Sequence, residues 1–102
     1  MPDSKEGCRA ILYRRQQNIL KTLGQNIKLA RQRRGLTPQL FCERTGINRF
    51  LLRQVENGDG EVCIAHYLLI LDALNLANDL GKVAIEAEMN PSPASLLQSQ
   101  GN

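Results

Sequence analysis

The side chains of this 102-residue chain that could do chemistry are mainly its basic ones, and they are unevenly distributed. Residues 1–58 hold twelve Lys and Arg against four Asp and Glu, whereas residues 59–102 hold one Lys against six Asp and Glu. The formal charges of the two parts are therefore +8 and −5, although the whole chain carries only +3. A basic part beside an acidic part indicates that one end of the molecule faces a polyanion. Solvated surface charge that happens to cluster is the alternative.

The chain offers little for catalysis or metal binding. Its one histidine, His66, lies in an apolar stretch, and the sequence has neither a Gly-rich phosphate loop nor paired carboxylates beside a nucleophile. Cys8, Cys42 and Cys63 are far apart and form no CxxC pair, so we expect neither a zinc site nor a disulfide framework. Cys42 and Cys63 are typical of small buried hydrophobic residues. The sequence therefore predicts no enzyme, no metal and no cofactor.

Length and composition predict one small globular domain. With 42% hydrophobic and 23% charged residues, the chain can fill one core but has no room for a second catalytic domain. The most apolar run, 62–71, is far shorter than the roughly 20 residues of a membrane helix. The first ten residues lack the pattern of a secretory signal. We expect no membrane contact and a cytoplasmic protein.

Apolar residues recur at spacings of three and four through most of the chain, which predicts an all-α fold. Residues 1–21 form a basic extension that we expect to be helical. Thr22 and Gln25 fit a capping box, which would start a new helix there. The two segments could equally run through as one rod. The helix stops at Gly35, after a cluster of arginines that suits the negative end of its dipole.

Two short helices with the same capping pattern are predicted next. Thr37 caps the first, Pro38 takes its first position, and Gly46 ends it. Asn48 caps the second, which Gly58 ends. Two helices of about eight residues around one glycine turn have the spacing of a helix-turn-helix unit.

A further helix, expected around 64–74, is so apolar that it needs cover on more than one side. Leu69 makes it hydrophobic almost all round. In so short a chain a second subunit is the simplest cover, so we expect a homodimer. The residues expected at its interface are Tyr67, Leu69 and Leu76.

The C-terminal part of the sequence is ambiguous. Residues 81–89 favour a helix, but their alternating pattern also fits a strand that would pair with its copy in a dimer. Residues 90–102 are polar and rich in proline and serine, and we expect them to be disordered.

The chain resembles the Cro and phage-repressor family of helix-turn-helix regulators. The resemblance covers 23–80 and rests on the ungapped run LGQNIKLARQRRGLTPQLFCERTGINRFLLRQVENG. The following GDGEVCIAHYLLILDALNL is similar to the fourth helix of a subgroup, some of whose members are encoded beside toxin genes. The resemblance implies a lambda-repressor-like bundle of about five helices with its DNA-binding domain at 22–80. It also implies a homodimer that reads a pseudo-palindromic operator with the third helix in the major groove.

This resemblance assigns the reading of bases to the third helix. Side chains early in such a helix and one turn later point toward base edges, which here are Arg49, Phe50 and Arg53. Arginine can donate two hydrogen bonds to guanine, worth about 1–3 kcal/mol against a wrong base, whereas Phe50 could only press on a thymine methyl or a sugar. The alternative is that Phe50 and Leu51 are packed residues or a protein-binding patch.

Phosphate contacts would set the register of the third helix on DNA. The candidates are Arg34, Thr37, Gln39, Asn48, Gln54 and Asn57. The family often has a phosphate-binding glutamine where Pro38 stands, so Gln39 or the Thr37 hydroxyl would have to replace it. Cys42 stands where the family usually has alanine, another small residue that lets two helices approach.

The function predicted from the sequence is sequence-specific binding of double-stranded DNA by a dimeric transcriptional repressor on the nucleoid. The alternative is an antitoxin or adaptor that holds a protein partner and uses DNA binding for autoregulation. Phe50, Leu51 and the excess apolar helix all permit that alternative.

Overall fold

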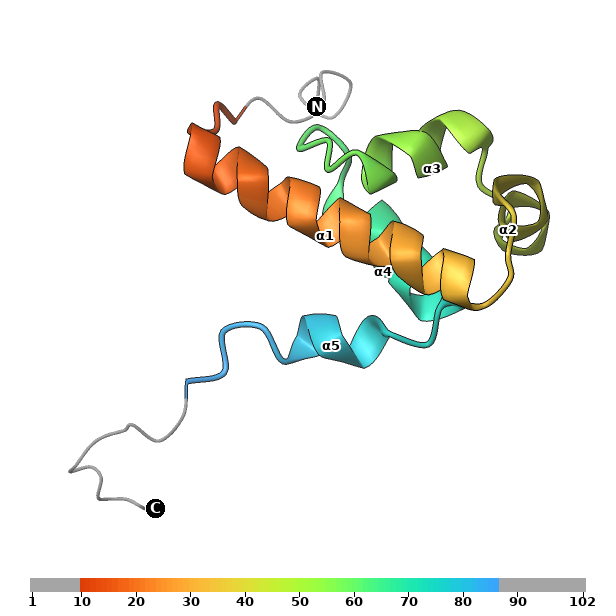
Figure 1. Ribbon diagram of the computed structural model, residues 1–102. Coiled ribbons are helices and arrows are strands. Elements are labelled where there is room, and N and C mark those ends of the chain that lie inside the picture. The colour runs from red at the N-terminus through yellow and green to blue at the C-terminus, as the bar shows by residue number, and fades with distance from the viewer. Residues whose placement is uncertain (1–9, 87–102) are drawn as a thin grey trace, which may run out of the picture.

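The computed structural model describes residues 10–86, and all regular structure within that range is helical (Figure 1). Its five helices are α1 (Arg14–Arg33), α2 (Pro38–Thr45), α3 (Arg49–Glu56), α4 (Ile64–Ala73) and α5 (Ala77–Gly81). The prediction of an all-α fold with about five helices is therefore confirmed. None of these helices is both long and apolar enough to span a bilayer.

α1 is one continuous helix of 20 residues. Its first turn is closed by Gln16, whose Oε1 accepts a hydrogen bond from the Tyr13 N–H at 3.0 Å. No new helix starts at Thr22, so the two basic segments run through as one rod. The expected boundary between residues 21 and 22 thus falls inside a helix. Residues 10–13 are not helical, and residues 1–9 lie outside the described range.

The predicted capping of the two short helices is confirmed. The Leu40 N–H donates to Thr37 Oγ1 at 3.1 Å, and the Leu51 N–H donates to Asn48 Oδ1 at 2.7 Å. Between the helices, Gly46 closes α2 with a φ of 82°, in the left-handed region where glycine has no steric penalty. Because each cap satisfies an N–H that has no partner inside its own helix, these boundaries follow from local sequence.

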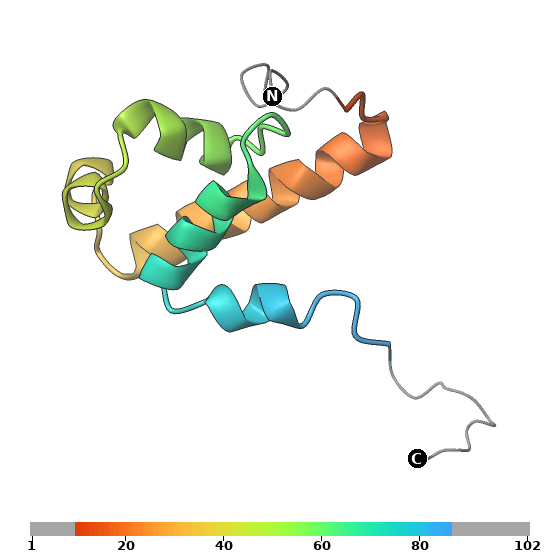
Figure 2. The same cartoon turned by 180° about the vertical axis from the view of Figure 1, so that it is seen from behind.

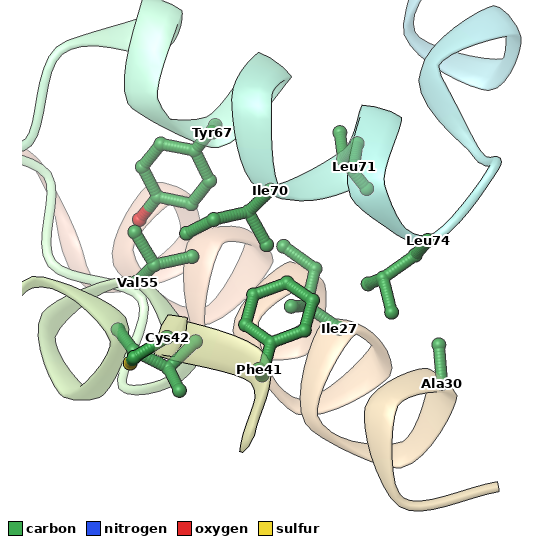
Figure 3. Close-up of a cluster of buried hydrophobic side chains, with 10 residues drawn as sticks. Ile27, Ala30, Phe41, Cys42, Val55, Tyr67, Ile70, Leu71 and Leu74 are labelled. Atoms are coloured by element: carbon green, nitrogen blue, oxygen red, sulfur yellow. The ribbon is translucent and has the colours of Figure 1, made fainter. Parts of the chain in front are cut away.

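The core lies where α1, α2, α3 and α4 meet (Figure 3). Its buried apolar residues are Ile27, Ala30, Phe41, Cys42, Leu52, Val55, Tyr67, Ile70, Leu71 and Leu74. Cys42 is buried as expected, and burial raises the pKa of its thiol. Cys63 is exposed just before α4, so its predicted burial is wrong. Cys42 therefore contributes to the packing of α2 against the core, whereas Cys63 does not.

α1 and α3 approach each other closely at two glycines. A Cβ on Gly24 would lie 2.5 Å from the Glu56 carbonyl oxygen, and a Cβ on Gly58 would lie 2.5 Å from that of Leu20. Both neighbours are backbone atoms, which cannot swing aside as a side chain could. The absence of side chains at these two positions therefore sets the distance between α1 and α3.

Neither a helix nor a strand forms over residues 82–86, which corrects the expectation for 81–89. α5 ends at Gly81, and the chain then turns through residues 82–84. Ala84 has a φ of 75°, which neither a helix nor a strand accommodates. Val83 and Ile85 are exposed, so burial of their side chains does not stabilise a helix or a strand here. Residues 87–89 and the tail at 90–102 lie outside the described residues.

Candidate nucleic-acid interface

α3 turns two arginines and a phenylalanine outward. Arg49, Phe50 and Arg53 are all exposed, and Phe50 keeps 67% of its surface in contact with solvent. Within residues 10–86 neither guanidinium donates to a protein acceptor at hydrogen-bond distance. Leu52 and Val55, on the other side of α3, are buried in the core. The helix therefore presents two unengaged donor groups at i and i+4 on one face.

Phe50 and Leu51 could each have been packed against the core, but only Leu51 is. Leu51 is half-buried against the core. Phe50 is not covered by any described part of the chain. An exposed aromatic ring between two arginines can contact either a thymine methyl or another protein.

A concave site of about 260 Å³, which we call the cationic hollow, lies between α1 and α3. Gln25 and Lys28 line it from α1, Arg49 and Arg53 line it from α3, and Asn57 lies at the end of α3. The sequence analysis missed Lys28 and Gln25. The available signal was their helical spacing, since Lys28 stands three residues before Arg31 on one face of α1.

The floor of the cationic hollow is a buried ion pair between α1 and α3. Arg31 Nε lies 2.7 Å from Glu56 Oε2, and their side chains are only 5% and 10% exposed. Arg31 also donates from Nη2 to Glu56 Oε1 at 3.2 Å and from Nη1 to the Leu36 carbonyl at 2.7 Å. Since Glu56 neutralises Arg31, the free positive charge of the hollow comes from Lys28, Arg49 and Arg53.

Four of the expected phosphate contacts are exposed near this surface: Thr37, Gln39, Asn48 and Asn57. The oxygens of Thr37 and Asn48 accept hydrogen bonds from their own helices. Gln39 Nε2 donates to Glu43 Oε2 at 3.3 Å, a weak contact on an exposed face. These contacts leave the side chains available, and a role in phosphate binding stays a prediction for each.

Arg34 and Gln54, the other two residues expected to contact phosphate, make hydrogen bonds within the protein, although Arg34 is exposed and Gln54 is half-buried. Arg34 donates from Nη1 to the Ala30 carbonyl and from Nη2 to the Leu74 carbonyl, both at 2.8 Å, and so ties the end of α1 to the end of α4. Gln54 Nε2 donates to Asp59 Oδ2 at 3.0 Å. Asp59 and Glu61 also make the loop after α3 acidic, which disfavours a phosphate beside Gln54.

The three residues expected at a dimer interface lie in different surroundings. Tyr67 is a correction, because its ring is buried in the core and its hydroxyl donates to the Asp59 carbonyl at 2.9 Å (Figure 3). Burial, followed by the nearby Asp59 carboxylate, raises the pKa of this phenol. Leu76 is half-buried against the core, whereas Leu69 is 56% exposed. Leu69 is thus the residue of the three with most of its surface open to a partner.

No known protein family matches this chain, and no curated protein is detectably similar to it in sequence. The function therefore has to be inferred from the surface of α1, α2 and α3.

Proposed function

We propose that this chain is a sequence-specific regulator that binds double-stranded DNA with α3 in the major groove. The observation that carries the proposal is the outward pair Arg49 and Arg53, whose guanidinium groups have no acceptor within the described residues. An α-helix fits the major groove of B-DNA, and arginine there can donate two hydrogen bonds to guanine O6 and N7. Phe50, between them, would contact a thymine methyl.

The charge around α3 supports the same orientation. Lys28 stands on the α1 side of the cationic hollow, where it would meet a phosphate of the strand beside the groove. The exposed N-terminal ends of α2 and α3, at Thr37 and Asn48, offer helix termini that attract anions. Of the negative side chains of α4 and α5, Asp72 is exposed on α4 and Asp79 is exposed on α5, which lies on the other side of α1 from α3 (Figure 1).

As a regulator of this kind, the protein would act as a homodimer on a pseudo-palindromic operator, on the nucleoid in the cytoplasm. Repression is the simplest outcome, since a bound dimer blocks access to the promoter that it covers.

A second function is favoured by one observation, the 67% exposure of Phe50. In an antitoxin or adaptor, this ring would anchor a protein partner and DNA binding would serve autoregulation. Such a partner would compete with DNA for the same face of α3.

The test is selection of bound duplexes from a random-sequence DNA library, followed by fluorescence anisotropy on the enriched site. We expect enrichment of guanine-containing half-sites and an affinity that falls steeply with salt, because bound phosphates release counterions. Arg49→Ala and Arg53→Ala should each reduce the discrimination between bases at one position of the site. Arg44→Ala is the control, because Arg44 is exposed on α2 outside the cationic hollow. No enrichment together with a flat salt response would rule the proposal out.

A further inference from the structure

The cationic hollow reaches deeper into the protein than its charged rim. Two of its lining residues belong to the interior, since Leu52 is 2% exposed and Arg31 is 4% exposed. Pro38, the first residue of α2, also lines it. A phosphate of a duplex is flanked by its sugars and approaches a protein surface from outside. The depth of this hollow therefore favours a small anionic group that can enter it.

The charge of the hollow is strongly positive for its size. Four cationic side chains line its volume of about 260 Å³: Lys28, Arg31, Arg49 and Arg53. Among the described residues that line it, Glu56 is the one acidic side chain, which leaves a net charge of +3. Within residues 10–86 no carboxylate pairs with Lys28, Arg49 or Arg53. Because these three like charges repel one another, an anion between them would stabilise the arrangement.

We propose that the cationic hollow binds a diphosphate group, either as free pyrophosphate or as part of a nucleoside diphosphate. Pockets that enclose a drug-sized ligand measure about 300–1,000 Å³, so a hollow of about 260 Å³ has room for the diphosphate but not for a whole nucleotide. A terminal phosphate carries nearly two negative charges at pH 7, and the phosphate linked to it carries one more. The group therefore carries about three negative charges, which match the net charge of the hollow.

The donors that would hold the two phosphates come from both walls of the hollow. Arg49 and Arg53 on α3 have planar guanidinium groups, each of which can donate two parallel hydrogen bonds to a phosphate. Lys28 on α1 supplies a compact positive charge, and the side chains of Gln25 and Asn57 add amide N–H donors. A diphosphate can contact both walls at once, since it has one phosphate for each.

The two walls are joined beneath the hollow. Arg31 Nε lies 2.7 Å from Glu56 Oε2, which ties α1 to α3, and Gly24 lets the two helices approach closely. A site whose backbone is already in place loses less conformational entropy when its ligand binds. The packing of α1 against α3 therefore prepares the hollow for an anion of fixed size.

The acidic residues of the other elements lie outside the hollow. Asp72 and Asp79 belong to α4 and α5, which contribute no lining residue. α4 lies behind α1 in Figure 1 and in front of it in Figure 2, where the molecule is seen from the opposite side. Asp59 and Glu61, in the loop after α3, line a separate depression beside Leu12. None of these carboxylates therefore occupies the place of the anion.

A diphosphate in the hollow would control DNA binding. This step rests on the proposed function, in which Arg49 and Arg53 donate to bases. Both side chains would have to leave the hollow to reach base edges, whereas a bound diphosphate holds them there. Its negative charge would also repel the approaching duplex. Diphosphate and DNA therefore exclude each other, and a diphosphate would release the regulator from its operator.

Isothermal titration calorimetry of the full chain with sodium pyrophosphate, without DNA, tests the site. Sodium chloride holds the ionic strength constant, and a separate titration with sodium sulfate measures non-specific anion binding. We expect saturable binding of one pyrophosphate per chain. Sulfate should bind at least about tenfold more weakly, because it cannot contact both walls. No saturable binding up to about 5 mM pyrophosphate, or equal binding of sulfate, would overturn the proposal.

Lys28→Ala tests the α1 wall, with Lys21→Ala as its matched control. Both lysines are exposed on α1, and each variant removes one positive charge, but Lys21 does not line the hollow. K28A should weaken pyrophosphate binding about tenfold or more, because a charge-assisted hydrogen bond is lost. K21A should leave it unchanged, and circular dichroism should show the parent helix content in both. Equal weakening in the two variants would mean that pyrophosphate responds to net charge alone, which contradicts a site in the hollow.

AMP and ADP identify the part of a nucleotide that is bound. ADP should bind about as tightly as pyrophosphate, because its nucleoside stays outside the hollow. AMP should bind at least about tenfold more weakly, because it lacks the second phosphate. Binding of pyrophosphate without binding of ADP would assign the site to the free anion. Equal binding of AMP and ADP would overturn the assignment to a diphosphate.

Fluorescence anisotropy on the enriched duplex, at constant ionic strength, measures the competition. Pyrophosphate should displace the duplex at the concentrations that saturate the calorimetric site. Simultaneous binding of pyrophosphate and duplex would overturn the competition. A chain that binds no duplex would contradict the proposed function, while the titrations without DNA would still decide whether the hollow binds a diphosphate.

Discussion

α3 and α4 are neighbouring helices that each leave one face uncovered, and the two faces differ in chemistry. The face of α3 carries Arg49 and Arg53 above a buried ion pair, with the exposed ring of Phe50 as its one large apolar group. The face of α4 carries Ile64, Leu68 and Leu69 and a single charge. Both helices cover the same core. We propose that this difference reflects different partners, DNA for α3 and another protein chain for α4.

The largest effect is expected at the ion pair beneath the α3 face. Arg31→Ala should lower the free energy of unfolding by about 3–5 kcal/mol, because it leaves the Glu56 carboxylate buried and unpaired. Chemical denaturation measures this, with Arg33→Ala, exposed on the same helix, as the control. The double variant Arg31→Met with Glu56→Leu should lose less, since no charge remains buried. A loss below 1 kcal/mol for R31A would mean that the pair does not hold α1 to α3.

The second largest effect is expected in DNA recognition by the α3 face. Arg53→Ala should cost about 1–3 kcal/mol of discrimination at one base pair of the enriched operator, because one bidentate contact is lost. It should not change the sedimentation of the free protein. Equal weakening on every operator variant would show that Arg53 contacts phosphate and does not read a base.

A smaller effect is expected at the edge of the cationic hollow. Lys28→Ala should weaken binding to all duplexes alike and reduce the slope of log affinity against log salt by about one. A contact between two copies through the exposed apolar residues of α4 should respond little to salt over the same range. An unchanged slope in Lys28→Ala would remove Lys28 from the DNA contacts.

The smallest effect concerns the inward side of α4. Tyr67→Phe should lower the free energy of unfolding at pH 7 by about 1 kcal/mol, because the hydrogen bond to the Asp59 carbonyl is lost. The Tyr67 pKa is raised in the folded chain, so its contribution is full below the unfolded value of about 10 and is lost as the pH rises through the folded value. Y67F should therefore lose less stability than the parent between pH 9 and pH 12. Cys42, whose pKa is raised by burial, acts in the same direction but is present in both proteins. Identical alkaline declines would contradict this account of Tyr67.

The sequence predicted the elements better than it predicted their surroundings. Thr37, Asn48 and Gly46 fixed the bounds of α2 and α3 correctly, because a cap acts within one turn of the chain. The prediction of a helix or strand over 81–89 was wrong for residues 82–86. An alternating apolar pattern forms a strand only when another strand is there to pair with it.

The candidate site was predicted in part, for the same reason. Arg49, Phe50 and Arg53 are outward as expected, since helical spacing alone relates them to the buried Leu52. Their contacts with bases stay predictions. Lys28 was missed because its place beside α3 depends on how α1 crosses that helix.

The order and ends of the helices and the separation of basic from acidic charge were determined by the sequence, because both depend on residues close together along the chain. Tertiary structure alone decided that Arg31 pairs with Glu56, that Arg34 bonds to the Leu74 carbonyl, that Tyr67 is buried, and that Lys28 joins Arg53 around one hollow. The physical reason is that these contacts join segments 25 to 40 residues apart or, for Tyr67, follow from which side of α4 faces the core. Such contacts are fixed by core packing, which the close approach of α1 and α3 at Gly24 and Gly58 permits.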